Sequence, residues 1–329
     1  MLIASADFAA IKLASRILAS GGLVAIPTET VYGLAASLSQ PAALQRIYQV
    51  KGRPSSHPLI VHVAELSQAL PLVQSFPEAA KKLADAFWPG PLTLVLPRSH
   101  SVPDCITAGH STVGIRIPQH PVALQLLREL GSPIAAPSAN RFTQVSPTRA
   151  AHVAVDIGHD LELILDGGPC EVGVESTVLD LSGPKPMLLR PGGISREALE
   201  FVLEATVAEP VRGIAKAPSP GQHHLHYSPR AEVRIATAAE IWSSAASLAR
   251  AGRRIRVFTA QKPPPDWLAP ATCDAWIWPA DQQAIARDLY ARFRQADTDQ
   301  VEVLIVELPE PTGLGLALAD RLRRAAGQG

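Results

Sequence analysis

The stretch "KGRPSSHPLIVHV", residues 51–63, joins a cationic loop to an apolar run. Lys51 and Arg53 lie at the start of the loop. His57 comes just before the apolar run, and His62 lies near its end. Two prolines restrict the loop backbone, and a short apolar run bounded by turn residues is typical of a buried strand. The stretch therefore predicts a sheet strand whose entrance carries cations and imidazoles.

Helix and strand patterns alternate on both sides of this stretch. Helical periodicity is found at residues 6–22, 41–50, 77–87, 121–130 and 195–205. Short apolar strands are predicted at residues 23–28, 58–63, 93–97, 113–118, 132–139, 161–168, 175–181 and 186–193. This alternation predicts an α/β sheet domain over residues 1–205.

A segment rich in proline and glycine follows at residues 206–231, "TVAEPVRGIAKAPSPGQHHLHYSPRA". It lacks a hydrophobic period and predicts an interdomain linker, although its "HHLHYSP" supplies side chains able to contact a ligand. Residues 232–329 alternate again and predict a smaller, Rossmann-like α/β domain with a parallel sheet. The "GLGLALAD" near its end lacks the GxGxxG spacing, so a tight strand-to-helix turn is favoured over a dinucleotide site.

Composition excludes several classes of protein. The 329 residues are 47% apolar and 18% charged, with a formal net charge of zero. No apolar run approaches the roughly 20 residues that cross a bilayer, and the N-terminus lacks signal-peptide features, so a cytoplasmic protein is expected. Zero net charge disfavours nucleic-acid binding by bulk electrostatics. Cys105, Cys170 and Cys273 form no CxxC pair, which disfavours disulfides and a structural zinc site.

Polar residues at the ends of the apolar strands are the candidates for chemistry. They are Thr28, Thr30, Arg116, Ser138, Asn140, Ser146, Thr148, Glu175, Ser176, Thr177 and Arg190. Taken alone, Arg116 fits an edge residue facing water as well as a bidentate clamp on a carboxylate or phosphate. Strand ends gather into a crevice in open α/β sheets, and hydroxyls with single arginines suit an anionic, polyhydroxylated ligand such as ATP.

Familiar catalytic motifs are absent from the sequence. It contains no GxxxxGK[ST] phosphate loop, no HExxH zinc motif, no GxSxG elbow and no evident Cys–His or Ser–His–Asp pairing. These absences favour catalysis by positioning and charge neutralisation, as in phosphoryl or nucleotidyl transfer.

Seven ordered motifs together resemble the YrdC-like family. They are "PTETVYGL", "KGRPSSHPLIVHV", "WPGPLTLVL", "VGIRIPQHP", "APSAN" with "SPT", "DGG" with "GVESTVLDL", and "LLRPGGIS". With the linker and the small C-terminal domain, the chain is similar to the long, two-domain members. The resemblance implies a twisted α/β sheet with a concave cationic cavity. It also implies condensation of L-threonine, bicarbonate and ATP into L-threonylcarbamoyladenylate, with release of pyrophosphate.

The resemblance carries binding residues onto this sequence. On the threonine side it implies Thr30, His62, Arg116, Ala136 and Ser176. On the ATP side it implies Arg53, His57, Thr112, Ser138, Ser146, Arg190 and, from the linker, Tyr227. Lys51 and Arg53 are the implied catalytic cations. Many relatives carry asparagine at the His57 position, and a histidine there donates a hydrogen bond with a charge that varies near neutral pH.

The resemblance also implies a cofactor, a lid and partners. Mg²⁺ is expected on the ATP phosphates, because the sequence offers no carboxylate cluster. The linker is expected to close over the nucleotide as a lid. The product is expected to pass to a tRNA threonylcarbamoyl-transferase complex, which makes N6-threonylcarbamoyladenosine, with only weak or indirect tRNA contact by this chain and no membrane association.

Two other functions stay open on the sequence alone. Carbamoyl-adenylate-forming domains of the hydrogenase-maturation type share the sheet but lie in larger chains with acylphosphatase and zinc-finger modules. A non-catalytic double-stranded RNA-binding module would use the concave face, and the zero net charge and the ligand-like linker disfavour it.

Overall fold

The computed structural model describes residues 2–209, 226–265, 267 and 271–328. Chain contacts divide the protein into a first unit, Met1–Phe142 with Ser146–Gln222, and a second unit, Thr143–Val145 with His223–Gly329. Most of the linker expected at residues 206–231 lies outside the described residues. In the described part of the chain, no helix has the length and apolar character that a membrane span requires.

A mixed sheet forms the centre of the first unit. Over the described residues it has ten strands, in the order β1-β8-β2-β3-β7-β4-β6-β5-β9-β10. The strands are β1 (Leu2–Ser5), β2 (Val24–Ile26), β3 (Gly33–Ser37), β4 (Ile60–His62), β5 (Leu92–Pro97), β6 (Thr112–Arg116), β7 (Ile134–Ala135), β8 (Leu163–Asp166), β9 (Thr177–Asp180) and β10 (Met187–Arg190). Pairing is parallel in β1/β8, β2/β8, β4/β6 and β5/β9 and antiparallel in the other five pairs.

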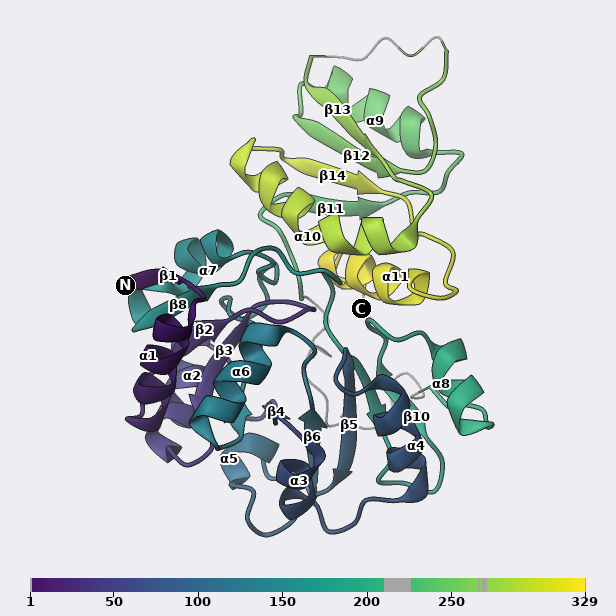
Figure 1. Cartoon of the computed structure of the whole chain (residues 1–329). Helices are drawn as coiled ribbons and strands as arrows, with labels where there is room; N and C mark the ends of the chain where they lie inside the picture. Colours follow the sequence, from purple (N-terminus) through teal and green to yellow (C-terminus); the bar gives the residue numbers. More distant parts are fainter. Residues whose placement is uncertain (1, 210–225, 266, 268–270, 329) are drawn as a thin grey trace. The chain divides into compact units, whose positions relative to one another are not determined.

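Helices connect and cover these strands. They are α1 (Phe8–Ala19), α2 (Pro41–Lys51), α3 (Leu66–Ala69), α4 (Glu78–Phe87), α5 (Asp104–Thr107), α6 (Pro121–Leu130), α7 (Ala150–Ile157) and α8 (Arg196–Leu203), with 3₁₀ turns η1 (Leu70–Leu72) and η2 (Gly158–Asp160). Helices α1 and α6 lie side by side and bury apolar side chains against β2, β3 and β8 (Figure 1). Helix α4 packs against α8 near β10 (Figure 1).

Local sequence explains where the best-defined elements begin and end. Helix α1 starts after Asp7, whose carboxylate accepts a 2.8 Å hydrogen bond from the Ala10 amide. Helix α2 begins with Pro41 and ends before Gly52, which takes the left-handed conformation with φ of 61°. Lys51 is thus the last residue of a helix, and the cationic loop begins after it.

Strands β4 and β6 place two of the expected site residues side by side. They pair in parallel, and His62 is the register partner of Arg116. Both side chains are buried, at 3% and 4% exposure. Each residue is the last of its strand, so the carboxyl ends of these neighbouring strands bring an imidazole and a guanidinium together.

A close approach of backbone segments fixes the position of residues 175–177. A Cβ added at Gly192 would lie 2.3 Å from the Glu175 carbonyl oxygen and 2.3 Å from the Thr177 amide nitrogen. The loop after β10 therefore passes directly against the segment that carries Ser176. Only glycine fits there without moving that segment.

The second unit is a small α/β structure. Within its described residues a four-stranded sheet has the order β11-β14-β12-β13, and its three strand pairs are all parallel. Its elements are β11 (Glu232–Ile235), α9 (Ile241–Arg250), β12 (Ile255–Thr259), β13 (Cys273–Ile277), α10 (Gln282–Thr298), β14 (Val303–Val306) and α11 (Gly315–Ala325). Helix α9 packs on Ile255 and Val257 of β12, whereas Phe258 stacks on Phe293 of α10. Helices thus cover both faces, as parallel sheets require.

The expected fold class is confirmed, and the prediction missed three strands. Strand β1 was not expected, nor was β3, whose sequence "GLAAS" contains residues of low strand propensity. Strand β11, "EVRI", carries two charged residues in four. It is an edge strand in the sheet order, and its Glu232 and Arg234 side chains hydrogen-bond each other at 2.7 Å. Tertiary pairing overrides weak local propensity at these places.

We expect Gly192→Ala to destabilise the first unit, because the new methyl group collides with backbone atoms rather than with a flexible side chain. Overpacking of this kind costs about 2 kcal/mol, which lowers the midpoint of thermal unfolding by roughly 4–8 °C in a unit of this size. The matched control is Gly183→Ala, since a Cβ there meets no atom within 4 Å. Equal midpoints for the two variants would contradict the close-approach interpretation.

Candidate active site

Arg116 is the centre of the threonine-side residues. Its Nε donates to the Gly90 carbonyl at 3.2 Å, Nη1 donates to Thr30 Oγ1 at 3.0 Å, and Nη2 donates to Glu29 Oε1 at 2.6 Å. A guanidinium carries five N–H groups. Two of them therefore have no partner among the described residues, one on each terminal nitrogen. This is the arrangement that a carboxylate ligand can meet with both oxygens.

Glu29 forms a buried ion pair with Arg116 that the sequence analysis did not anticipate. Side-chain exposure is 3% for Glu29 and 5% for Arg116, and the two oppositely charged atoms lie 2.6 Å apart. Beside them, Thr30 Oγ1 contacts Thr28 Oγ1 at 2.9 Å, and Thr28 donates to the Val31 carbonyl at 2.6 Å. The "PTETV" turn is thereby held in one conformation against Arg116.

His62 is a neutral imidazole at this site. Burial and the positive charge of Arg116 lower the pKa of His62 to about 3. Its Nδ1 lies 3.3 Å from the Ile60 carbonyl oxygen, which can only accept, so Nδ1 carries the proton and Nε2 is left as an acceptor. The buried Ala136, also expected on the threonine side, donates its amide to the same Ile60 carbonyl at 3.2 Å.

Ser176 links the threonine-side set to Arg190 of the ATP-side set. Its hydroxyl lies 2.8 Å from Thr93 Oγ1, and Arg190 Nη2 donates to it at 3.0 Å. Arg190 also donates twice to the Ser176 carbonyl, at 3.1 and 2.9 Å. Thr93 belongs to the same cluster although it was not among the expected site residues.

Lys51 is buried and held by backbone carbonyls. Its Nζ donates to the Ser138 carbonyl at 2.5 Å and to the Asn140 carbonyl at 2.7 Å. Burial, followed by the charge of Arg53, lowers its pKa well below the ordinary lysine value. An anion arriving beside Lys51 would oppose both effects and favour the protonated amine. The hydrogen bond to the Ser138 carbonyl brings Lys51, an expected catalytic residue, into direct contact with an expected ATP-binding residue.

Arg53 and His57 gather around Phe142. Arg53 Nη2 donates to the Pro58 carbonyl at 3.0 Å, and its guanidinium carbon lies 5.8 Å from the Phe142 ring centroid. The His57 ring meets the same ring edge-on, with centroids 5.3 Å apart. The loop that follows α2 is thus organised on one aromatic side chain, and the Phe142 amide donates to the Lys51 carbonyl at 2.7 Å.

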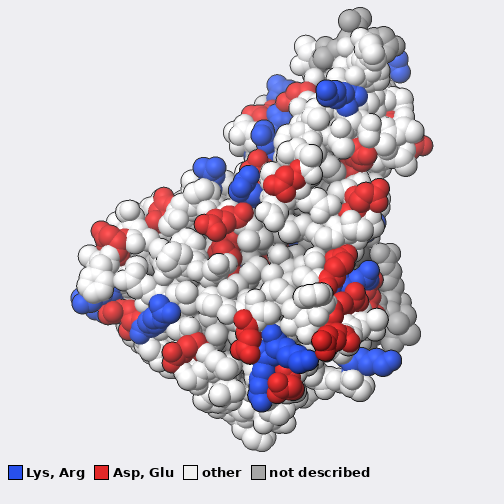
Figure 2. All heavy atoms as spheres, turned by 45° about the vertical axis from the view of Figure 1, so that its right-hand side comes forward, with Lys and Arg blue, Asp and Glu red and all other residues white. Residues whose placement is uncertain are grey.

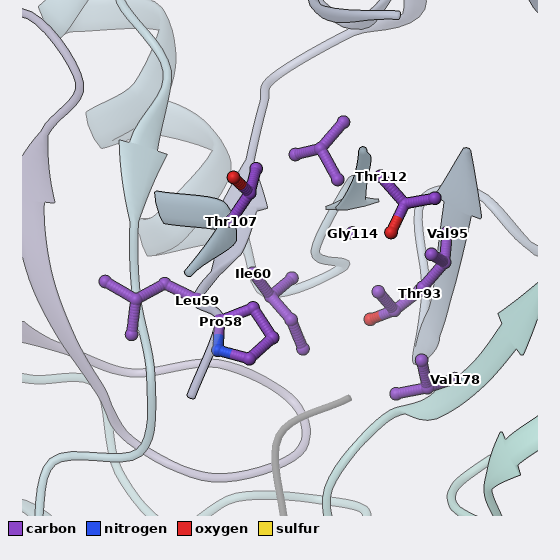
Figure 3. A pocket seen from close by; sticks show the side chains of 10 residues that line it. Pro58, Leu59, Ile60, Thr93, Val95, Thr107, Thr112, Gly114 and Val178 are labelled. Atoms are coloured by element: carbon purple, nitrogen blue, oxygen red, sulfur yellow. The ribbon is translucent and has the colours of Figure 1, made fainter. Parts of the chain in front are cut away.

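A small pocket lies between this loop and the middle of the sheet. It is lined by Pro58 and Leu59 of the loop, by Ile60 of β4, and by residues of β5 and β6. Thr112 and Thr93 direct their hydroxyl groups toward it (Figure 3). The pocket is therefore bordered by Thr112, which is expected on the ATP side, and by Thr93. Thr93 in turn contacts Ser176, which is expected on the threonine side. Pro58, whose carbonyl receives Arg53, closes it from the loop.

The two remaining expected residues lie in different units. Ser146 is fully buried in the first unit and donates to Glu175 Oε1 at 2.6 Å, next to Ser176 in the chain. Tyr227 belongs to the second unit, where its ring stacks on Tyr290 with centroids 5.8 Å apart, and the Arg321 guanidinium lies 4.8 Å from its centroid. His223 and His224 of the linker lie outside the described residues.

Most charged side chains of the described site are cations, and main-chain carbonyl groups accept hydrogen bonds from them. Lys51, Arg53, Arg116 and Arg190 are all buried, and each donates to at least one main-chain carbonyl. No group of three or more His, Cys, Asp or Glu side chains comes together as a metal site among the described residues. On the face drawn in Figure 2, coloured basic and acidic side chains are interspersed.

Sequence reasoning missed Glu29 and Thr93 as members of the site and saw Asn140 only as one of the strand-end polar residues. Signals for them existed in the motifs. Glu29 lies between the two threonines of "PTETV", and Thr93 is a hydroxyl inside the apolar strand of "WPGPLTLVL". Their partners Arg116 and Ser176 are 87 and 83 residues away, so only the folded chain shows the contacts.

Two protein-family models match the chain. The Sua5/YciO/YrdC model, described as telomere recombination, matches residues 16–192. A second model, described as the C-terminal domain of threonylcarbamoyl-AMP synthase, matches residues 194–327. The two matches together span nearly all of the chain from residue 16 to residue 327.

Full-length relatives and a solved structure agree with these matches. Threonylcarbamoyl-AMP synthase of Pyrococcus abyssi (strain GE5 / Orsay) is 41% identical over 326 residues, covering 96% of this chain and 94% of its own length. The protein of the same name from Bacillus subtilis (strain 168) is 42% identical over 326 residues, covering 96% and 93%. The crystal structure of P. abyssi Sua5 complexed with L-threonine has a TM-score of 0.93 at 39% identity, covering 100% of this chain and 98% of that one.

We expect the stability of the first unit to depend on His62 below neutral pH. In the unfolded chain His62 binds a proton near its ordinary pKa of about 6.5, whereas the folded state takes one only near pH 3. Between these values the unfolded state holds the extra proton. The contribution of His62 to the free energy of unfolding therefore falls as the pH is lowered, by up to about 1.4 kcal/mol per pH unit.

His62→Gln removes this titration and keeps a polar side chain. Denaturant unfolding of both proteins between about pH 7.5 and about pH 5 should show that wild type loses more stability than the variant. Parallel pH curves would contradict a neutral, buried His62.

We expect the Glu29–Arg116 pair to show strong energetic coupling. Arg116→Met leaves a buried carboxylate without its partner and should cost about 3–5 kcal/mol. Adding Glu29→Met should restore more than half of that loss, because the double variant buries no charge. The measurement is a double-mutant cycle by denaturant unfolding.

The exposed pair of Arg46 and Glu162 is the control for this cycle. Its charged atoms lie 3.0 Å apart at 38% exposure each, so Arg46→Met should cost less than about 1 kcal/mol. Additive losses at Glu29 and Arg116 would refute the coupling.

Proposed function

The chain belongs to the Sua5/YciO/YrdC family, in the two-domain group named threonylcarbamoyl-AMP synthase, and on that premise we propose how its first unit performs the synthesis. It is an enzyme of the nucleotidyltransferase type that makes an AMP-linked intermediate. Its substrates in this proposal are L-threonine, bicarbonate and ATP, and its products are L-threonylcarbamoyladenylate and pyrophosphate.

The observation that carries this proposal is the way the buried cations are held. Carbonyl oxygens accept hydrogen bonds from Lys51, Arg53 and Arg190, and a carbonyl brings no net negative charge. An anionic ligand placed beside these cations is attracted to them, and low dielectric surroundings strengthen the attraction. A triphosphate is the kind of ligand that several such cations suit.

Arg116 binds the carboxylate of L-threonine in this proposal. Its two remaining N–H groups match two carboxylate oxygens, and the neutral His62 beside it adds no second positive charge. Ser176 and Thr30 supply hydroxyl groups on either side of the amino acid, and the buried Ala136 forms part of the wall.

The reaction proceeds in two stages. The amino group of threonine combines with bicarbonate to give a carbamate and water. A carbamate oxygen then attacks the α-phosphorus of ATP, so a new O–P bond forms, and the bond to the β-phosphate oxygen breaks with pyrophosphate leaving. The attacking oxygen is already anionic. The main task of the site is therefore to hold two anions together, which Lys51, Arg53 and Arg190 perform by neutralisation.

The ATP side is completed by polar residues around the loop and the pocket. Thr112 contacts the nucleotide from the pocket, and His57, Ser138 and Ser146 contribute further hydrogen bonds. In this proposal the linker closes over the nucleotide as a lid, and Tyr227 contacts the nucleotide.

Mg²⁺ enters this proposal as part of the nucleotide. The described residues bring together no cluster of three metal-binding side chains, so they offer no donor set for a resident metal. The ion would come as the Mg²⁺ complex of ATP, held by phosphate oxygens and water.

The product's fate follows from its chemistry. A mixed carbamic–phosphoric anhydride transfers its acyl part readily, so we propose a tRNA threonylcarbamoyl-transferase complex as acceptor, in the cytoplasm. Direct tRNA contact by this chain is weak in this proposal. Its net charge is zero, and basic and acidic side chains are interspersed on the face of Figure 2.

We expect the purified protein to release pyrophosphate only when ATP, L-threonine and bicarbonate are all present. Mass spectrometry of the mixture should show L-threonylcarbamoyladenylate. Arg116→Lys, which keeps the charge but loses the fork, should raise the KM for threonine about tenfold or more and leave the KM for ATP nearly unchanged.

Arg53→Gln is the matched variant for the other substrate and should raise mainly the KM for ATP. Pyrophosphate release without threonine would favour a carbamoyl-adenylate-forming enzyme instead. Equal effects of both variants on both substrates would remove the proposed division of the site.

A further inference from the structure

The two oxygens of the Glu29 carboxylate have different surroundings. Oε1 accepts the 2.6 Å hydrogen bond from Arg116, whereas Oε2 is buried and has no hydrogen-bond partner among the described residues. The whole residue is 2% exposed. Buried polar atoms without partners are rare in folded proteins. Leaving a buried carboxylate oxygen without a hydrogen bond costs more free energy than leaving a neutral acceptor without one. This atom is therefore fitted to a donor that arrives with the substrate.

We propose that Glu29 binds the α-ammonium group of the amino-acid substrate and accepts a proton from it. The inference rests on the proposed function and assigns a residue for its first stage. An α-amino acid carries its carboxylate and its ammonium group on one carbon. If Arg116 holds the carboxylate, the ammonium group must lie close by, and Glu29 is the carboxylate in direct contact with Arg116.

The neighbours of Glu29 support this assignment. An ammonium group placed beside Arg116 meets a positive charge, and the neutral His62 cannot offset that charge. Glu29 supplies the negative charge instead. The Arg116–Glu29 pair is thus complementary to a zwitterion, one partner for each charge, and a charge-assisted hydrogen bond to each is worth more than a neutral one.

Access to Glu29 requires only a small movement. Oε2 is out of contact with solvent in the ligand-free chain. The terminal torsion of a glutamate side chain is broad, so a partial rotation about it redirects the two oxygens at low cost. When the substrate carboxylate occupies Arg116, this rotation turns one Glu29 oxygen toward the ammonium group.

Proton acceptance by Glu29 makes the amine reactive. A protonated amine has no lone pair for attack, so one N–H bond must break first, and the proton forms an O–H bond on Glu29. The free amine attacks the bicarbonate carbon, forming an N–C bond. The C–O bond to the hydroxyl breaks, and this hydroxyl leaves as water with a second proton from the nitrogen. Glu29 then returns its proton to solvent, and the carbamate remains.

Calorimetric binding of L-threonine and of (R)-3-hydroxybutanoate tests the contact with the amino group. The second compound is threonine without that group. Wild-type protein should bind threonine about tenfold or more tightly than the analogue, because only threonine forms the charge-assisted bond. In Glu29→Gln, threonine affinity should fall while analogue affinity stays within about two-fold, so the ratio approaches one.

The same experiment distinguishes a positional role. If Glu29 only orients Arg116, Glu29→Gln weakens both compounds by one factor, and the proposal is overturned. Equal affinity of wild type for the two compounds also overturns it, even if the variant fails to fold. Failure of wild type to bind threonine at all overturns the proposed function with it. Unchanged ATP affinity of Glu29→Gln, measured alongside, shows that the rest of the site is intact.

Pyrophosphate release at saturating threonine tests the proton step. Glu29→Gln should lower kcat about a hundredfold, within the range for loss of a positioned general base. Glu29→Asp keeps the carboxylate and should recover part of that loss. An unchanged kcat in Glu29→Gln, with the predicted loss of threonine affinity, would refute proton acceptance and leave the binding role standing.

Discussion

The first unit depends on burying cationic side chains and supporting them with main-chain carbonyls. Four cations there are almost inaccessible, and water no longer solvates them. Main-chain carbonyls replace part of that hydration. The contacts are Lys51 to Ser138 and Asn140, Arg53 to Pro58, Arg116 to Gly90, and Arg190 to Ser176. Carbonyl dipoles accept hydrogen bonds without carrying a net charge, so the loops that end the strands support these cations.

Arg116 is in direct contact with the Glu29 carboxylate. That pair has no net charge, which suits a zwitterion, whereas the surroundings of Lys51 and Arg53 suit a polyanion. Ser176, expected on the threonine side, contacts Thr93 at the pocket and Arg190 of the ATP side. A synthesis that combines an amino acid with a nucleotide needs such a contrast within one unit.

Sequence patterns predicted the frame of the site better than its contacts. Apolar runs predicted β4, β5, β6 and β8–β10, since their side chains are hydrophobic enough to mark buried strands. Strand β3 escaped because glycine and alanine carry little strand signal. Glu29 escaped because glutamate is ordinarily exposed, and its partner lies 87 residues away. The resemblance named Arg116 for the threonine side, but no local pattern could report that a carboxylate was already bound to it.

The parallel register of β4 and β6 has a consequence for how this site can evolve or be redesigned. His62 and Arg116 are register partners, and side chains alternate between the two faces of a strand. Inserting or deleting a single residue in either strand would turn one of the two away from the other. New substrate preferences must therefore arise by exchanging side chains at fixed backbone length, while length variation is confined to the connecting loops.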